Sequence, residues 1–314
     1  MTGRLPLLVI AGPTGVGKTA AAIALARRLP LEVVSADSRQ VYRGMDVATG
    51  KPTAAERAAV THHLIDIAAP DDRYSAARFR QDAAAAIAGI HARGRLPVVV
   101  GGTGLYIRAL LRGLDGAAPA DAAFRAELAG IAADRGRGAL HDRLRQEAPA
   151  MARRLHPNDS VRVMRALERL RAGAPVGEEQ RAWRDGEPAW DTVYVGLTMD
   201  REALGRRLRA RAAAMVEAGL AAEVGGLLAR GYDADLPAMQ SIGYREFAQV
   251  ARGELSAAEA LRLMQRDTVR YARRQWTWFT REPGIEWLDM KTEAGVEHAA
   301  AALETRLARG GVIG

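Results

Sequence analysis

One eight-residue stretch constrains the fold of this chain more than any other. Residues Gly12–Thr19 read GPTGVGKT and lie between the apolar run Leu7–Ile10 and the alanine-rich segment Ala20–Leu29. The order of strand, glycine loop and helix is the context of the G-x-x-x-x-G-K-[ST] motif, in which backbone N–H groups and a helix N-terminus converge on a phosphate. The expected phosphate-binding residues are Gly12, Pro13, Thr14, Gly15, Val16, Gly17, Lys18 and Thr19. The loop predicts a phosphate ligand but does not identify a nucleotide.

Short apolar runs alternate with helical segments along much of the chain. Strands are predicted at Leu31–Ser35, Leu96–Val100 and Thr192–Leu197, and helices at Ser75–His91 and from Leu105 onward. The first strands each end in polar or glycine residues. This pattern predicts an α/β fold with a P-loop NTPase-like parallel sheet flanked by helices, and a ligand site along one edge of that sheet.

The pattern changes after residue 113. Between there and residue 188 we predict helices at Asp121–Ala133, Leu140–Glu147 and Ser160–Ala172, and we find no convincing strand. We therefore expect three parts. Residues 1–118 form the first part of the P-loop core, residues 119–188 an all-helical insertion domain, and residues 189–314 the second part of the core with basic, aromatic C-terminal helices.

Composition restricts the partners and the compartment. The chain has 314 residues, 48% of them hydrophobic, and no cysteine, which excludes disulfides and thiolate metal sites. A metal would need oxygen or histidine ligands, and Mg²⁺ is the expected ion. No apolar run approaches the roughly 20 residues that span a bilayer. We expect a cytoplasmic monomer with no membrane partner. The net charge of +8 suits a polyanionic partner but does not identify one.

The segment Arg262–Arg281 concentrates the positive charge. It contains six arginines and a single acid, Asp267, and aromatic side chains are interleaved among the arginines. A helix with these arginines at spacings of three and four could be an ordinary solvated basic face. In a chain that also has a phosphate-binding loop, guanidinium groups mixed with aromatics favour an RNA-binding surface.

Several longer motifs extend over nearly the whole chain. They are SADSRQVYRGMD from Ser35, HHLIDI from His62, GGTGLYIRALL from Gly101, NDSVRVMRALE from Asn158, IGYREF from Ile242 and RYARRQWTWF from Arg270. With these motifs the chain resembles the tRNA dimethylallyltransferase (tRNA isopentenyltransferase) family. ADSRQVY and GGTGLY, in this order and spacing, are specific to that family and to its relatives, the adenylate isopentenyltransferases.

The resemblance implies a reaction. Enzymes of the family move a dimethylallyl group from dimethylallyl diphosphate to N6 of an adenosine beside the anticodon in tRNA. The phosphate loop would then bind a prenyl diphosphate with Mg²⁺ on Thr19, and Arg211 would also bind the diphosphate. Asp37 matches the family's general base, which accepts the proton of a weakly nucleophilic amine. Thr103 matches a residue that contacts the RNA near the reacting centre.

The resemblance also implies an interface with the anticodon arm of tRNA. Its expected contacts are Asp37, Ser38, Arg39, Gln40, Thr103, Arg125, Val161, Arg162, Val163, Met164, Arg165, Arg273, Arg274, Gln275, Trp276, Thr277, Trp278, Phe279 and Thr280.

Plainer alternatives stay open at this stage. Asp37 could be a magnesium ligand as in other P-loop proteins, Thr103 a helix N-cap, and Arg211 a surface arginine. His62 and His63 could suggest a metal pair, but adjacent residues of a strand point to opposite faces, which favours a structural role. For the whole chain, the alternatives are an adenylate isopentenyltransferase that acts on free AMP, ADP or ATP, and a P-loop kinase or NTPase.

Overall fold

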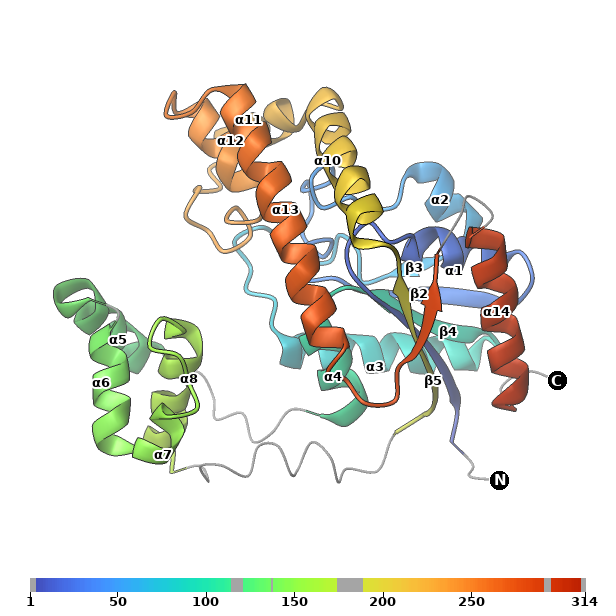
Figure 1. Cartoon of the computed structure of the whole chain (residues 1–314), viewed down its shortest axis with the longest axis horizontal. Helices are drawn as coiled ribbons and strands as arrows, with labels where there is room; N and C mark the ends of the chain where they lie inside the picture. Colours follow the sequence, from blue (N-terminus) through green and yellow to red (C-terminus); the bar gives the residue numbers. More distant parts are fainter. Residues whose placement is uncertain (1–3, 114–120, 137, 174–188, 291–294, 312–314) are drawn as a thin grey trace. The chain divides into compact units, whose positions relative to one another are not determined.

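The computed structural model describes residues 4–113, 121–136, 138–173, 189–290 and 295–311. The chain divides into two compact units. Residues 1–111 and 188–314 form the first, which we call the core unit, and residues 112–187 form the second, which we call the helical unit. The core unit contains the sheet (Figure 1).

All the strand pairs of the six-stranded sheet are parallel, and the strand order is β3-β2-β4-β1-β5-β6. The strands are β1 Pro6–Ala11, β2 Leu31–Ala36, β3 His62–His63, β4 Leu96–Gly101, β5 Asp191–Thr198 and β6 Glu286–Asp289. β1 lies in the centre, with Ile10 opposite Val100 on one side and Val195 on the other. The carboxyl ends of β1, β2 and β4 therefore meet at one edge.

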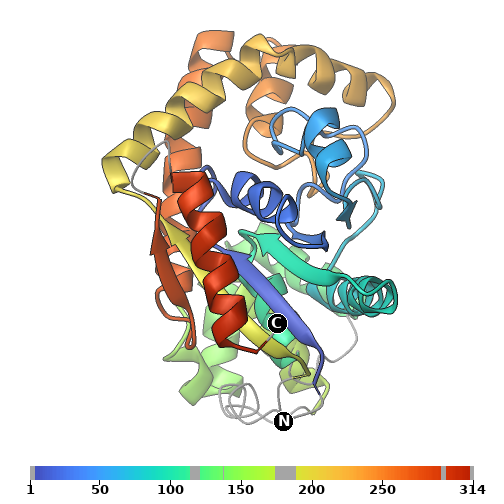
Figure 2. The same cartoon turned by 90° about the vertical axis from the view of Figure 1, so that its right-hand side faces the viewer.

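Successive residues of β1 point into two different hydrophobic cores. Leu7 and Val9 pack with Phe79 of α3 in one core, whereas Leu8 and Ile10 pack with helices α1 and α14 in the other. Because both faces are covered, the strand is a continuous apolar run and not an alternating one. Figure 2 shows α14, in red, across one face of the sheet.

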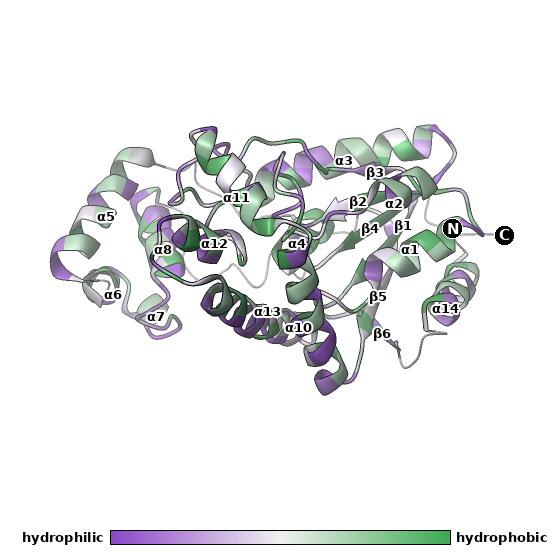
Figure 3. Ribbon diagram, turned by 90° about the horizontal axis from the view of Figure 1, so that it is seen from above, coloured by the Kyte–Doolittle hydropathy of each residue, from purple (hydrophilic) through white to green (hydrophobic). Residues whose placement is uncertain are grey.

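Nine helices of the core unit lie within the described residues. They are α1 Lys18–Ala26, α2 Ala54–Ala59, α3 Ala76–Ala92, α4 Gly104–Arg112, α10 Arg201–Glu217, α11 Leu220–Ala229, α12 Tyr244–Ala251, α13 Ala257–Phe279 and α14 Gly295–Arg309. Ser256 and Glu259 form a capping box at the start of α13. Hydrophobic and hydrophilic residues both occur along α13 (Figure 3). This helix contains the basic segment from Arg262 up to Phe279.

The helical unit has its own small core. Its helices are α5 Ala122–Arg135, α6 Gly138–Glu147, α7 Pro149–Ala152 and α8 Ser160–Arg171. Phe124, Leu140, Leu144 and Leu167 are buried among them. The described residues of this unit contain no strand.

Among the described residues, no single helix is both long enough and apolar enough to cross a membrane. The adjacent helices α10 and α11 pass that test only as a pair, by length and composition, and they are bent by 57°.

Candidate functional site

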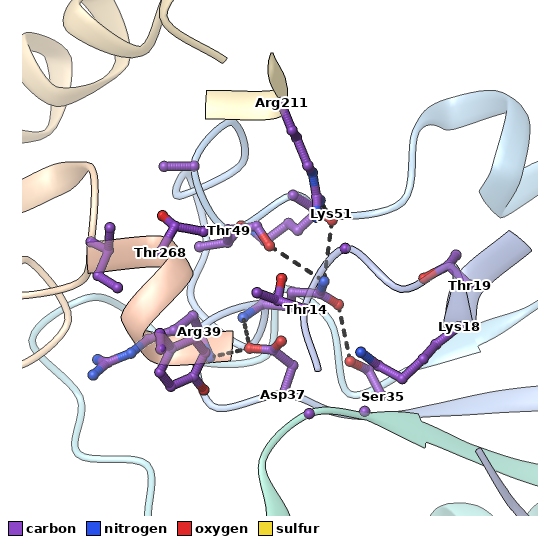
Figure 4. A pocket seen from close by; sticks show the side chains of 18 of the residues that line it. Thr14, Lys18, Thr19, Ser35, Asp37, Arg39, Thr49, Lys51, Arg211 and Thr268 are labelled. Carbon is purple, nitrogen blue, oxygen red and sulfur yellow. Dashed lines mark hydrogen bonds between the residues drawn. The ribbon is translucent and has the colours of Figure 1, made fainter. Parts of the chain in front are cut away.

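A cavity of about 640 Å³ opens at the carboxyl edge of the sheet in the core unit. Its walls come from the loops that follow β1, β2 and β4, and from helices α10 and α13. In Figure 4, Arg211 enters the cavity from α10, Lys18 lies at the start of α1, and Asp37 lies directly after β2. The topology therefore brings together residues that are far apart in the sequence.

The phosphate loop joins β1 to α1 without any side-chain cap on the helix. Gly12 has a φ of 140°, and a Cβ there would lie 2.5 Å from the carbonyl oxygen of Leu197, so only glycine fits. Gly17 precedes α1 and leaves the first amides of the helix without a side-chain partner. This geometry suits an anion at the helix N-terminus.

Lys18 folds back on the phosphate loop. Its ammonium group donates hydrogen bonds to the carbonyl oxygens of Gly12 at 3.0 Å and Pro13 at 2.9 Å. Burial lowers the pKa of Lys18 to about 8, because the charged form is poorly solvated there. The charge of Asp37 opposes this shift, and that of Arg211 adds to it. The hydrogen-bond acceptors of Lys18 among the described residues are backbone carbonyl oxygens, so its positive charge can interact with an anion bound in the cavity.

Arg211 supplies a second positive charge to the cavity. Burial lowers the pKa of its guanidinium group, and the neighbouring Arg207 lowers it further. The side chain reaches the carbonyl oxygen of Gly50 at 3.5 Å. Two cations crowded into one partly buried space are stabilised by a ligand with more than one negative charge, such as a diphosphate.

Asp37 follows β2 and is fixed by its own loop. One carboxylate oxygen, Oδ1, accepts hydrogen bonds from the backbone N–H of Arg39 at 2.8 Å and of Gln40 at 3.4 Å. The backbone N–H of Ser38 donates to the hydroxyl of Thr103 at 3.1 Å. Thr103 immediately precedes α4, the position of an N-cap, but this bond directs its hydroxyl to the loop after β2.

Arg39 and Gln40 are anchored to other parts of the core unit. Arg39 donates a 2.8 Å hydrogen bond to the carbonyl oxygen of Pro237. The side-chain amide of Gln40 donates to the carbonyl oxygen of Gly50 at 3.2 Å and accepts from the hydroxyl of Ser35 at 3.0 Å. Gln40 therefore stabilises the wall of the cavity in this structure, and the same Gly50 carbonyl lies within reach of Arg211.

Three residues of the expected tRNA interface are buried in this structure and do not lie on its outer surface. Gln275 is 7% exposed and Phe279 is 0% exposed, both in the core unit. Val163 is likewise 0% exposed within the helical unit. An α-helix cannot turn every residue of a continuous range outward, and these three occupy the inward-facing positions. The side chains of Val163 and Phe279 have no exposed surface, whereas that of Gln275 lines the cavity.

Other members of the expected interface are accessible or packed against neighbours. Val161 is 77% exposed, and Arg273, Arg274 and Thr277 on α13 and Thr280 at its C-cap are exposed. Arg125 forms an ion pair with the buried carboxylate of Glu168. Trp276 lies 4.8 Å from Trp287 between ring centroids, and Trp278 lies under the guanidinium of Arg108 at 4.2 Å.

The site also contains residues that were not predicted from the sequence. Tyr271 and Arg207 line the cavity. Burial, together with the charge of Asp37, raises the pKa of Tyr271 to about 12. Lys51 is buried and bonds to the carbonyl oxygen of Tyr42 at 2.6 Å and to Asp46 at 2.5 Å. The spacing of Arg207 and Arg211, one helical turn apart, could have indicated that both face the cavity.

The donor groups in the cavity fit Mg²⁺ better than a transition metal. Thr19 and Asp37 line the cavity and offer oxygen atoms, whereas no group of three or more His, Cys, Asp or Glu side chains that could bind a metal is found among the described residues. Mg²⁺ commonly binds through one or two protein oxygens together with substrate phosphates and water. His63 bonds to Glu32 at 2.6 Å and His62 to the Val60 carbonyl at 2.8 Å, and His62 also lines the cavity.

Comparison with known proteins gives one consistent family. The family model described as "IPP transferase" matches residues 40–282, and one described as "Isopentenyl transferase" matches residues 5–70. The chain is 50% identical over 287 residues to tRNA dimethylallyltransferase 1 of Syntrophotalea carbinolica, covering 91% of both chains. It is 52% identical over 282 residues to the tRNA dimethylallyltransferase of Anaeromyxobacter sp. strain K, covering 90% of this chain and 92% of the relative.

Solved structures agree with these relatives. The full-length tRNA isopentenylpyrophosphate transferase of Bacillus halodurans has a TM-score of 0.72 at 39% identity, covering 98% of each chain. A eukaryotic dimethylallyltransferase acting on tRNA has a TM-score of 0.80 at 26% identity, covering 98% of this chain and 79% of the other. The fold is thus the P-loop NTPase-like one that the sequence predicted. A family match over most of the sequence, together with a shared fold, shows that this chain belongs to the IPP transferase family.

Proposed function

We propose that this protein transfers a dimethylallyl group from dimethylallyl diphosphate to N6 of the adenosine on the 3′ side of the anticodon in tRNA. One observation carries the proposal: the cations Lys18 and Arg211 and the carboxylate Asp37 line a single cavity. Such a cavity can bind a diphosphate and take a proton from a nucleophile beside it. The curated relatives at about half identity are named for this activity on tRNA, and none of those described above is named for free AMP.

The diphosphate end of the reaction uses the phosphate loop. As the bond between the allylic carbon and the diphosphate oxygen breaks, the electron pair leaves with the diphosphate and negative charge grows on it. Lys18, Arg211 and the loop amides stabilise that charge. Thr19 and the diphosphate oxygens would bind Mg²⁺, with Asp37 as a further oxygen ligand if it faces the ion, and the ion supplies charge neutralisation of the leaving group.

The adenosine end of the reaction uses the loop after β2. A bond forms between the allylic carbon and N6, and one N6 proton is transferred to the carboxylate of Asp37. The hydrogen bonds from Arg39 and Gln40 occupy Oδ1 and fix the plane of the carboxylate. An adenosine must leave its stack to enter such a cavity. We assign Thr103 to a contact with that nucleotide, and its hydrogen bond from Ser38, the residue after Asp37, supports this assignment.

The tRNA substrate accounts for the basic surface of α13. Arg273 and Arg274 are exposed immediately before the buried Gln275. In the helical unit, Val161 and Arg162 are exposed at the start of α8. Guanidinium groups at the surface contribute salt-dependent affinity for an RNA backbone. Because the substrate is tRNA, we assign the reaction to the cytoplasm.

Labelled dimethylallyl diphosphate tests this function. The protein is incubated with Mg²⁺, the labelled donor, and either bulk tRNA or AMP. We expect label in tRNA and none in AMP, and we expect Asp37→Asn to abolish most of the incorporation. Label in AMP instead would support an adenylate isopentenyltransferase. Hydrolysis of ATP without incorporation into either acceptor would support a kinase or NTPase.

A further inference from the structure

We propose that Gln275 is a positioning residue of the diphosphate site, which orients the phosphate loop from the basic helix α13. The inference rests on the proposed function, because it assigns the diphosphate to that loop. The family resemblance assigns Gln275 to the tRNA contacts, but this residue is 7% exposed and lines the cavity instead of the outer surface of α13. Its side chain points instead to the two glycine-rich turns that build the cavity.

The amide of Gln275 bonds to both turns at once. Its oxygen, Oε1, accepts a 2.8 Å hydrogen bond from the backbone N–H of Thr14 in the phosphate loop. Its nitrogen, Nε2, donates a 2.9 Å hydrogen bond to the carbonyl oxygen of Gly102, next to Thr103. The partners fix the orientation of the amide, because one offers only a donor and the other only an acceptor. A neutral amide is the group that satisfies both without adding negative charge beside a diphosphate.

The backbone around Gly102 supports this assignment independently. A Cβ on Gly102 would lie 2.3 Å from Nε2 of Gln275 and 3.4 Å from the carbonyl oxygen of Gly12. A glycine is therefore needed for the amide to reach between the two turns. The turn after β4 and the phosphate loop are packed against each other around this one side chain.

The bond to Thr14 has a direct consequence for anion binding. When the Thr14 N–H is bonded to Gln275, the peptide that joins Pro13 to Thr14 has one fixed orientation before any ligand binds. The following amides of the loop are then arranged in advance, and binding sites gain affinity when their donors need no rearrangement. Without Gln275 the loop would keep its sequence but lose that fixed orientation.

A matched pair of variants separates this role from general stability. Gln275→Met keeps the length of the side chain and removes both hydrogen bonds. Gln265→Met is the control, because Gln265 lies on the same helix and its amide donates a 3.1 Å hydrogen bond to the carbonyl oxygen of Arg209, away from the loop. Affinity for inorganic diphosphate with Mg²⁺ is measured by calorimetry, and affinity for tRNA by filter binding.

We expect Gln275→Met to weaken diphosphate binding by about tenfold, because of the two lost hydrogen bonds the one from Thr14 lies in the phosphate loop, and losing it leaves the Thr14 N–H unpaired. Gln265→Met should bind diphosphate like the wild type, and tRNA affinity should stay within about twofold in both variants. In steady-state kinetics the KM for dimethylallyl diphosphate should rise in Gln275→Met while that for tRNA does not. Diphosphate binding equal to the wild type would overturn the inference, as would parallel losses of diphosphate and tRNA affinity.

The variant Gln275→Glu gives a second readout that does not depend on how well Gln275→Met folds. When ionised, the introduced carboxylate would face the Gly102 carbonyl with a negative oxygen, whereas the protonated carboxyl group can donate to that carbonyl and still accept from Thr14. The diphosphate affinity of Gln275→Glu is compared with that of the wild type at the same pH. We expect this ratio to rise toward one as the pH falls from about 7.5 to about 5, because a perturbed carboxyl group becomes protonated in that range. A ratio that does not change with pH would overturn the inference. Failure of the wild type itself to bind diphosphate would overturn the proposed function instead.

Discussion

The backbone N–H of Ser38 donates a 3.1 Å hydrogen bond to the hydroxyl of Thr103, which links the loops that follow the adjacent strands β2 and β4. The carboxylate of Asp37 belongs to the residue just before Ser38, and its Oδ1 is already bonded to Arg39. The orientation of the expected base is thus determined from both sides, by its own loop and by a residue that follows β4.

Replacing Thr103 tests that relationship. Thr103→Val keeps the shape of the side chain and removes the oxygen that accepts from Ser38. We expect the chemical step to slow by about tenfold, since an unpaired, partly buried N–H costs about 1–3 kcal/mol and the loop relaxes to avoid it. Thr103→Ser keeps the acceptor and should retain near-normal activity. Single-turnover kinetics with both substrates saturating measure the step, and equal rates for the Val and Ser variants would contradict this role.

Asp37→Asn should have a larger effect. The Asn side chain can still accept from the Arg39 N–H, so the loop stays folded, but it cannot take the proton from N6. We expect a loss of about two to four orders of magnitude in the single-turnover rate, the usual scale for a general base. Binding of tRNA and of dimethylallyl diphosphate should be largely unchanged. A rate restored by raising Mg²⁺ alone would assign Asp37 to the metal instead.

Diphosphate binding should depend on the charge of Lys18. Its pKa is lowered to about 8 by burial, and a bound diphosphate raises it again because an anion favours the ammonium form. The complex therefore binds the proton more tightly than the free protein, and the affinity for diphosphate is full below about pH 8 and falls as the pH rises above it. Calorimetric titration of inorganic diphosphate between about pH 7 and 10 measures this dependence.

Lys18→Met provides the comparison for that titration. The variant should bind diphosphate more weakly at pH 7, and its affinity should not decrease further as the pH rises through about 8. Its affinity for tRNA should equal that of the wild type, because the loop binds the donor substrate. A decrease of the same size in the variant would assign the titration to another group.

The basic face of α13 predicts a salt effect on tRNA binding. Replacing Arg270, Arg273 and Arg274 with Gln should weaken binding and reduce the slope of log Kd against log salt by about one unit for each phosphate contact removed. Arg270 lies 3.6 Å from Asp267, so it should contribute less than Arg273. Arg309→Gln on α14 is the control, because that exposed arginine lies in a helix packed against α1. An unchanged slope in the triple variant would show that these arginines face solvent and do not contact phosphates of the tRNA.

Much of the sheet could be predicted from the sequence, for a definite physical reason. A strand that is buried on both faces is a short, continuous apolar run. This pattern is present in Leu7–Ile10 and Leu96–Val100. The last glycine of the loop, Gly17, then fixes the start of α1, because its φ of 108° is one that glycine adopts readily. These features depend on neighbours in the sequence, and they match β1, β4 and α1.

The parts of the site that the sequence did not predict depend on distant partners. Gln275 and Thr14 are 261 residues apart, and no local pattern links them. A partial signal was present: Ala272, Gln275 and Phe279 occupy one face of a helix, and all three are buried. That periodicity could have separated Gln275 and Phe279 from the exposed arginines. It could not have shown which two turns the amide of Gln275 connects.

The strand order of the sheet also determines when the core unit can be completed during synthesis on the ribosome. β1 acquires β4 as one neighbour by Gly101, but its other neighbour, β5, begins only at Asp191. At about 5–20 residues per second, the chain between them takes roughly 5–20 s to emerge. Throughout that interval β1 presents an edge of unpaired backbone N–H and C=O groups, which can pair with the strand of another chain. The nascent protein is therefore most exposed to misassembly while the helical unit is being made, and the length of that unit sets how long the exposure lasts.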